Sequence, residues 1–299
     1  MTADLNLRGV WIPLITPFSA DGSVDADAIA RLCGEYIDAG VAGIVALGTT
    51  GESPALDAAE KRLVIDTCAT ACNSRGVALM VGTGTNSTRT TVSATAALAD
   101  IAAVNSALVV VPYYVRPSEA AIVEHFKTVA AASPVPVVVY NIPYRTGRGL
   151  GAAAVLELAN VDNIAGIKQA VAALDADTLE ILRDAPDGFS VLCGDDAYIA
   201  PIMLMGGHGS ITAAAHVCTE RFVALVECCL HGKVEDGRRH AEALLEVVSA
   251  GFAEPNPAVW KAALHAQGRI ATPDLRAPMA AASSAATARL LSAITHAEA

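Results

Sequence analysis

Eight short apolar runs, rich in β-branched residues, recur along the chain and alternate with amphipathic segments. Strands of a parallel sheet have this nearly continuous apolar composition because both faces of the sheet are covered. Regular alternation of strands and helices is typical of parallel βα units, and similar units at near-even spacing favour a closed barrel. The sequence therefore predicts a (β/α)8 barrel of the TIM type. The expected strands are Val10–Pro17, Gly43–Leu47, Ala78–Gly82, Ala107–Tyr113, Pro136–Asn141, Ile164–Lys168, Phe189–Cys193 and Ser210–Ala213.

An open, doubly wound sheet is the alternative arrangement of the same units. When such a sheet binds a dinucleotide, a glycine-rich fingerprint follows its first strand. Gly82-Thr83-Gly84 follows an expected strand but lacks the remaining glycine at the required offset, which favours the barrel. The helical patterns between the strands include Asp25–Ala39, Asp57–Asn73, Thr88–Ala102, Ser118–Ala131 and Thr219–His231.

Three more helical patterns follow the eighth unit, at residues 235–251, 256–267 and 278–295. Prolines separate them, and proline rarely continues a helix. We therefore expect a catalytic barrel over residues 1–232 and a C-terminal helical extension over residues 233–299, which does not fold separately. The separating prolines are Pro255, Pro257, Pro273 and Pro278.

Composition excludes several classes of partner. The net charge of −11, without a basic stripe, argues against nucleic acid. No uncharged apolar run reaches the roughly 18 residues of a membrane span, since Asp100 and Asn105 interrupt the alanine-rich stretch at 92–111. Residues 1–8 carry Asp4 and do not resemble a signal peptide. Seven cysteines without a Cys-x-x-Cys pair are typical of buried thiols in a reducing compartment, so we expect a cytoplasmic protein.

Lys168 is the only one of the five lysines that falls in an expected strand. A lysine directed into a barrel is costly unless it is paired or used, because burial disfavours the charged ammonium. The same burial lowers its pKa and leaves a free amine that can attack a ketone. The alternative is a strand-end lysine that reaches solvent or an ion pair. The other lysines fall in helical patterns, where a solvated face explains them: Lys61, Lys127, Lys233 and Lys261.

Hydroxyl groups gather at the expected C-terminal ends of the strands, where (β/α)8 enzymes carry their catalytic residues. Schiff-base chemistry needs such groups because forming the imine and converting it into an enamine both move protons. Tyr140 and Tyr114, connected through the Thr50 hydroxyl, could provide this relay. Thr49 and Thr50 lie in a glycine-flanked turn that we expect to open a helix, where its backbone N–H groups could bind a carboxylate. The alternatives are a plain strand-to-helix turn capped by Ser53 or Asp57, and an interface role for Tyr114.

Seven short motifs in this chain resemble, in order, those of the dihydrodipicolinate synthase and N-acetylneuraminate lyase superfamily. The resemblance covers approximately residues 8–280 and is stronger to the synthases of the superfamily than to its sugar-acid lyases. The motifs are Gly48–Ser53, Pro112–Pro117, Tyr140–Gly147, Gly166–Lys168, Gly194–Ala197, Gly206–Gly209 and Glu254–Pro257.

The resemblance implies a lyase that uses pyruvate, in which Lys168 would form the Schiff base. Tyr140 would donate and accept protons, and Thr50 would connect it to Tyr114, which in this superfamily reaches into the site of a neighbouring subunit. Members usually form homotetramers assembled from tight dimers, so Tyr114 would make the dimer catalytically necessary. The residues that would bind substrate are Thr49, Thr50, Arg145, Gly194 and the backbone of Ile211.

Arg145 bears on the second substrate. The resemblance implies that it binds the carboxylate of L-aspartate semialdehyde, a task that suits the planar guanidinium. The product would be 4-hydroxy-tetrahydrodipicolinate, a precursor of diaminopimelate and lysine. Sugar-acid lyases of the superfamily generally lack this arginine. The alternative is a solvated loop arginine beside Arg148.

Four positions depart from the pattern of the superfamily. Gln169 follows the expected nucleophile where the synthases usually carry Glu, and strand alternation predicts that it points away from Lys168. In the lysine-feedback site of some synthases, Asn86 and Tyr113 match the pattern, whereas Lys61 and Thr90 replace a His and a Glu, so the resemblance leaves inhibition by lysine open. His216 stands where many members carry Asn.

Two other functions remain open at this point. One is a Schiff-base aldolase, lyase or dehydratase acting on a 2-keto-3-deoxy sugar acid or another 2-keto acid. The other is an inactive barrel that senses 2-keto acids, against which the set of Lys168, Tyr140 and Thr50 argues. No metal-ligand cluster, nucleotide-binding loop or prosthetic-group motif is visible in the sequence, so we expect no cofactor and no metal. The expected partners are pyruvate and an aldehyde acceptor.

Overall fold

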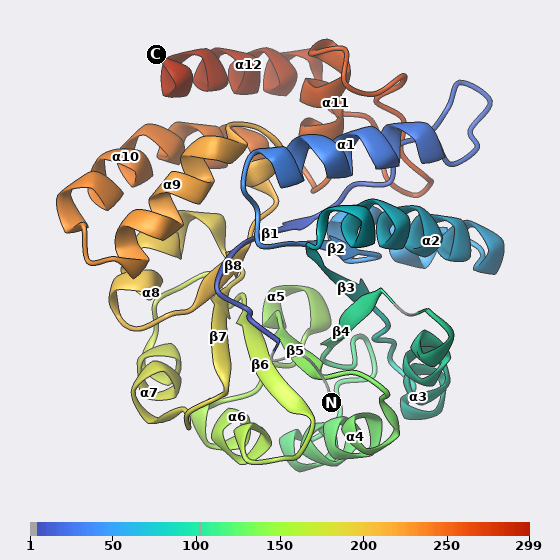
Figure 1. The fold of residues 1–299 in the computed structure, drawn as a ribbon, viewed down its shortest axis with the longest axis vertical. Coiled ribbons are helices and arrows are strands. Elements are labelled where there is room, and N and C mark those ends of the chain that lie inside the picture. The colour runs from blue at the N-terminus through green and yellow to red at the C-terminus, as the bar shows by residue number, and fades with distance from the viewer. Residues whose placement is uncertain (1–4, 102) are drawn as a thin grey trace.

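The computed structural model describes residues 5–101 and 103–299. Its eight strands are parallel and pair in sequence order, and β8 pairs with β1, which closes the barrel. Figure 1 shows the strands at the centre of the molecule with helices around them. The predicted TIM barrel is therefore confirmed. The strands are β1 (Gly9–Pro13), β2 (Gly43–Ala46), β3 (Ala78–Gly82), β4 (Val104–Val110), β5 (Val137–Asn141), β6 (Ile164–Gln169), β7 (Ser190–Cys193) and β8 (Gly209–Ile211).

Helices on the outside of the barrel connect consecutive strands (Figure 1). Those predicted between the strands are α1 (Ala26–Asp38), α2 (Ala58–Arg75), α3 (Thr88–Ala96), α4 (Glu119–Ala132) and α9 (Thr219–Leu230). The predicted end of the third pattern, Ala102, lies outside the described residues, and a 3-10 turn at Ala97–Asp100 follows α3. Four shorter helices complete the connections: α5 (Pro143–Thr146), α6 (Ala152–Ala159), α7 (Ala176–Asp184) and α8 (Ile199–Leu204).

Side-chain caps fix where several of these helices begin. Asp57 accepts a hydrogen bond from the Glu60 amide while the Glu60 carboxylate accepts one from the Asp57 amide, which forms a capping box at α2. Single caps begin other helices because Ser and Asp oxygens satisfy free N–H groups of the first turn. These caps are Asp25 for α1, Ser87 for α3, Ser118 for α4 and Asp175 for α7.

The inside of the barrel is apolar at its N-terminal end and polar at its C-terminal end. The fully buried Trp11 fills the apolar end together with Leu7, and its ring lies so close to Gly43 that a β-carbon there would come within 2.3 Å. A larger apolar layer lies between the strands and the surrounding helices. The N-terminal end is therefore closed by apolar side chains, whereas Tyr140 and Lys168 lie near the C-terminal ends of β5 and β6.

The strand boundaries differ from the predicted ones by up to four residues, and two of the observed strand ends bear on the site. β1 ends at Pro13 rather than at residue 17, and β4 ends at Val110 rather than at Tyr113. Both apolar runs continue past their strands because the following residues remain buried in loops. Tyr113 and Tyr114 consequently belong to the loop after β4.

The C-terminal extension consists of α10 (Val234–Gly251), α11 (Ala258–Ala266) and α12 (Ser284–Glu298). In Figure 1 these helices lie along one side of the ring, next to α9 and α1. The third helix begins later than predicted, after the capping residue Ser283, and Pro278 belongs to the segment before it. The division of the chain at residue 232 stays a prediction. Within the part of the chain that is described, no helix combines the length and apolar character needed to cross a bilayer.

Candidate active site

A cavity of about 310 Å³ lies at the C-terminal ends of the barrel strands. Seven of the eight residues predicted for the site line this cavity, although strands and loops far apart in sequence supply them. A second cavity, of about 380 Å³, adjoins it and shares Thr49, Tyr140 and Arg145 with it. The seven residues are Thr49, Thr50, Tyr140, Arg145, Lys168, Gly194 and Ile211.

Lys168 lies near the end of β6 and is only 6% exposed. Burial lowers the pKa of its amine to about 8, and the nearby Asp196 acts in the opposite direction. Gly194 leaves room for this side chain, because a β-carbon there would lie 3.0 Å from Cε of Lys168. A buried amine with a lowered pKa in a cavity is what nucleophilic attack on a ketone requires.

Tyr140 lies on β5 directly beside Lys168 in the register of the barrel. The Lys168 amine is 4.3 Å from the centroid of the Tyr140 ring. Burial raises the pKa of the phenol to about 12, while the Thr49 side chain acts to lower it. Tyr140 therefore keeps its proton near neutrality and can donate it to an atom held between the two side chains.

Two carboxyl groups, Asp195 and Asp196, follow β7 and line the same cavity as Lys168. Burial raises the pKa of both groups, and that of Asp196 reaches about 7. Backbone amides hold the two side chains in place: Ala172 donates to Asp195 and Ala214 donates to Asp196. No role was assigned to Asp195 and Asp196 from the sequence, although two adjacent acidic residues shortly after an expected strand indicate a candidate site.

The Thr49–Thr50 turn follows β2 as a short 3-10 helix, Thr49–Gly51. Leu47 and Glu52, on either side of it, both have left-handed backbone conformations, with φ of 56° and 53°. The turn does not open α2, which begins only at Ala58 behind its own cap Asp57. Non-glycine residues in this conformation cost about 1–3 kcal/mol each and persist only where the surroundings fix them.

Asn256, from the segment before α11, also reaches the site. Its side-chain amide donates a hydrogen bond of 3.0 Å to the Thr50 hydroxyl oxygen, and the residue lines both cavities. Since this oxygen accepts from Asn256, the Thr50 hydroxyl is free to donate its own proton to another group. The motif containing Asn256 was recognised in the sequence, but its contact with Thr50 could not be read from it.

Arg145 lies on the short helix α5, within the loop that connects β5 to α6, and Asn141 holds the ends of this connecting loop together. The Asn141 side chain donates to the carbonyl of Leu150 and accepts from its amide, with both distances at 3.1 Å. Asn141 also donates to the Gln169 side chain, which in turn donates to Thr178 on α7. Gln169 is thus directed away from Lys168, as strand alternation predicted.

Tyr114 is the predicted site residue that does not line the cavity. It is 87% exposed and has a left-handed backbone with φ of 71°. The preceding residue, Tyr113, lines the second cavity instead. Within this single chain, the relay predicted from Tyr140 through Thr50 to Tyr114 is therefore incomplete at its last member.

The solvated position predicted for Lys261 is wrong. This residue of α11 is fully buried and forms an ion pair of 2.9 Å with the buried Glu52. The prediction failed because the partner carboxylate is 209 residues away in the sequence. Lys61 is partly exposed and lines a third cavity, of about 410 Å³, together with Thr90.

No cluster of three or more His, Cys, Asp or Glu side chains suited to a metal ion occurs among the described residues.

Comparison with known proteins gives one family. The model of the dihydrodipicolinate synthetase family matches residues 6–297. A 4-hydroxy-tetrahydrodipicolinate synthase from Moorella thermoacetica is 40% identical over 269 residues, which cover 90% of this chain and 91% of that protein. The corresponding synthase of Neisseria meningitidis serogroup B is 38% identical over 273 residues, with 91% and 92% covered.

A solved structure gives the same result for the fold. The chloride-inhibited dihydrodipicolinate synthase of Acinetobacter baumannii, complexed with pyruvate, superposes with a TM-score of 0.93 at 30% identity. The match covers 98% of this chain and 99% of that chain.

Proposed function

Because the chain belongs to the dihydrodipicolinate synthetase family, we propose that it is a 4-hydroxy-tetrahydrodipicolinate synthase. It is a lyase that condenses pyruvate with L-aspartate semialdehyde through a Schiff base on Lys168. The observation that carries the assignment of the nucleophile is the buried Lys168 amine, with its pKa lowered to about 8, beside the Tyr140 phenol.

Each covalent step has a group in the cavity that can serve it. The unprotonated Lys168 amine attacks the ketone carbon of pyruvate, and the carbinolamine loses water to give the imine. Loss of a methyl proton converts the imine into an enamine, whose carbon attacks the aldehyde; this step restores the imine, and the aldehyde oxygen takes up a proton. The amino group of the semialdehyde then attacks the imine carbon and displaces the Lys168 amine, which closes the ring and releases the product. Tyr140 is placed to donate and accept the protons, and the Thr50 hydroxyl has a proton available to continue the relay.

The substrate carboxylates are assigned to two parts of the cavity. Thr49, Thr50 and the backbone of Ile211 bind the pyruvate carboxylate close to Lys168. Arg145, on its clamped loop, binds the carboxylate of the semialdehyde, where Tyr144 lies beneath its guanidinium at 5.4 Å from the ring centroid. The relatives reported above are all synthases, and they give no support to the alternative activity on a sugar acid.

The proposal includes a homotetramer assembled from dimers in which Tyr114 enters the site of the partner. Its support is that Tyr114 is exposed and does not line the cavity of its own chain, so its hydroxyl is accessible to a partner subunit. We also propose that the protein is cytoplasmic, as the sequence predicts.

Borohydride trapping with pyruvate tests the mechanism without presuming the acceptor. We expect reduction to attach the three-carbon unit to the peptide that contains Lys168, and a Lys168→Ala variant to give no adduct. Labelling of another lysine, or full activity of the variant, would contradict the Schiff-base assignment. A rate assay then compares L-aspartate semialdehyde with a 2-keto-3-deoxy sugar acid. If only the sugar acid is turned over, the protein is assigned as the alternative lyase and not as the synthase.

A further inference from the structure

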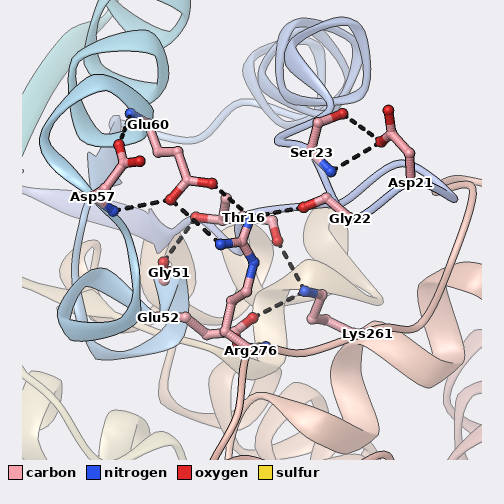
Figure 2. Close-up of polar contacts among 10 residues, drawn as sticks. All are labelled: Thr16, Asp21, Gly22, Ser23, Gly51, Glu52, Asp57, Glu60, Lys261 and Arg276. Carbon is pink, nitrogen blue, oxygen red and sulfur yellow. Dashed lines mark hydrogen bonds and ion pairs between the residues drawn. The ribbon is translucent and has the colours of Figure 1, made fainter.

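The ion pair between Lys261 and Glu52 joins the C-terminal extension to the turn that carries Thr49 and Thr50. Figure 2 shows the two side chains pointing toward each other below the loop that contains Thr16. The Lys261 ammonium donates to Glu52 and to the carbonyl of Thr16, both at 2.9 Å, and lies 4.1 Å from the centroid of the Phe18 ring. Lys261 is therefore fully satisfied without contact with water.

Glu52 is bound through both oxygens of its carboxylate. One oxygen accepts from Lys261, and the other accepts from the backbone amide of Arg276 at 2.8 Å (Figure 2). Both donors come from the C-terminal extension. The carboxylate thus fixes Glu52 in the left-handed conformation that ends the Thr49–Gly51 turn.

A second contact holds the same turn from its other side. The Thr16 hydroxyl donates to the carbonyl of Gly51 at 2.7 Å, and the Thr16 carbonyl accepts from Lys261. Lys261 thereby contacts, directly or through Thr16, both of the residues that follow Thr50. A shift of its ammonium would move the end of the turn whose start lines the candidate active site.

Stability alone gives little reason to bury such a pair. Desolvating two charges costs about as much as their attraction returns, and apolar replacements of buried pairs are often neutral or stabilising. In some proteins a buried charged pair is retained because it fixes the arrangement of the groups that it joins. We propose that Lys261 is a positioning residue for the reaction, which holds the Thr49–Thr50 turn in its pyruvate-binding geometry through Glu52 and Thr16. This inference rests on the proposed function.

Two linked variants separate positioning from stability. In Lys261→Met alone, the Glu52 carboxylate remains buried and uncompensated, so we expect a clear drop in the melting temperature. Adding Glu52→Gln removes that charge, and we expect the double variant to recover most of the melting temperature. The pyruvate concentration that gives half-maximal borohydride trapping on Lys168 should nevertheless rise about tenfold. The double variant lacks the hydrogen bond from Lys261 to the Glu52 carboxylate, and loss of a hydrogen bond to a charged group commonly changes an equilibrium by about this factor.

Lys127→Met is the matched control, since Lys127 pairs with Glu124 and Glu157 on the exposed surface of the barrel. It should leave both the melting temperature and the half-saturating pyruvate concentration near the wild-type values. A folded double variant with wild-type pyruvate dependence would overturn the positioning role. If the double variant does not fold, Thr16→Val decides, because it removes the hydrogen bond to the Gly51 carbonyl without leaving a buried charge unpaired. A higher half-saturating pyruvate concentration supports the role, and an unchanged value overturns it. Absence of any pyruvate adduct in the wild type would overturn the proposed function and this inference together.

Discussion

The Lys168 amine lies 4.3 Å from the centroid of the Tyr140 ring, and the two residues are direct neighbours in the register of β5 and β6. An aromatic face stabilises an ammonium ion, whereas burial destabilises it. Burial is the largest influence on the pKa of Lys168, which falls to about 8 although the charge of the nearby Asp196 acts to raise it. The amine is therefore close to its titration point at neutral pH.

The rate of pyruvate attachment to Lys168 should follow the fraction of free amine. Because the pKa is lowered to about 8, the rate should increase almost tenfold per pH unit below that value and level off above it. Timed borohydride quenching across a pH series measures this directly. A rate that keeps rising toward the reference pKa of about 10.4 would show that the amine is not desolvated as described.

Replacing Asn141 should affect the second substrate more than the first. Asn141→Ala removes the hydrogen bonds that close the loop carrying Arg145, so we expect the KM for L-aspartate semialdehyde to rise about tenfold. Trapping of pyruvate on Lys168 should remain near the wild-type level. Steady-state kinetics with both substrates gives the comparison.

Gln169→Glu is the matched control for this prediction. A carboxylate at position 169 can still accept from the Asn141 amide and from the Thr178 hydroxyl, so the loop should stay closed. Equal increases of KM in the two variants would argue against the loop-closing role of Asn141.

Removing the Tyr114 hydroxyl should lower turnover while leaving assembly intact. Tyr114→Phe keeps the ring that would contact a partner subunit but loses the proton-carrying group, so we expect kcat to fall about 100-fold. Analytical ultracentrifugation of the wild type and the variant should give the same mass. A variant with wild-type kcat would remove Tyr114 from the relay and leave it an interface residue.

His216 should make the protein sensitive to acid. The buried ring accepts a hydrogen bond from the Ile15 amide, and its other nitrogen lies 2.8 Å from the Ala213 carbonyl. Burial lowers the pKa of His216 to about 4 in the folded protein. The reference value for an unfolded chain is about 6.5. Between these two values the unfolded chain binds the proton, so the free energy of unfolding falls as the pH decreases.

The size of this effect can be measured against a variant. The contribution of His216 amounts to about 3 kcal/mol lost between pH 6.5 and pH 4, and His216→Asn should remove it. Urea titrations at several pH values would show a shallower pH dependence for the variant. Identical slopes would assign the acid sensitivity to other groups, among which His125 also has a pKa lowered to about 4 by burial.

The barrel and the buried lysine at the end of β6 could be predicted from the sequence because their signals are local. A strand buried on both faces is apolar along its whole length, and a lone lysine at the end of such a run is conspicuous. The short helices α5 to α8 were not delimited, since four to nine residues provide too few turns for a clear period. Whether Tyr114 points into a site or away from it depends on what contacts its surface, which a single chain does not specify.

The failures concern contacts between distant parts of the chain. Lys261 was placed on a solvated face because helical spacing reveals only which side of a helix is apolar. Its carboxylate partner follows β2, at the other end of the sequence. The contact of Asn256 with the site could not be predicted for the same reason, since its partner Thr50 is 206 residues away in the sequence.

The contacts of Lys261 and Asn256 also set an order of events during synthesis. A growing chain can pair all eight strands once residue 211 has emerged, yet the turn at Thr50 obtains its last anchors only with residues 256, 261 and 276. Chains that stop between these points lack the hydrogen bonds that Asn256, Lys261 and Arg276 make to Thr50 and Glu52. The geometry of the turn at Thr50 thus depends on the part of the chain that is synthesised last.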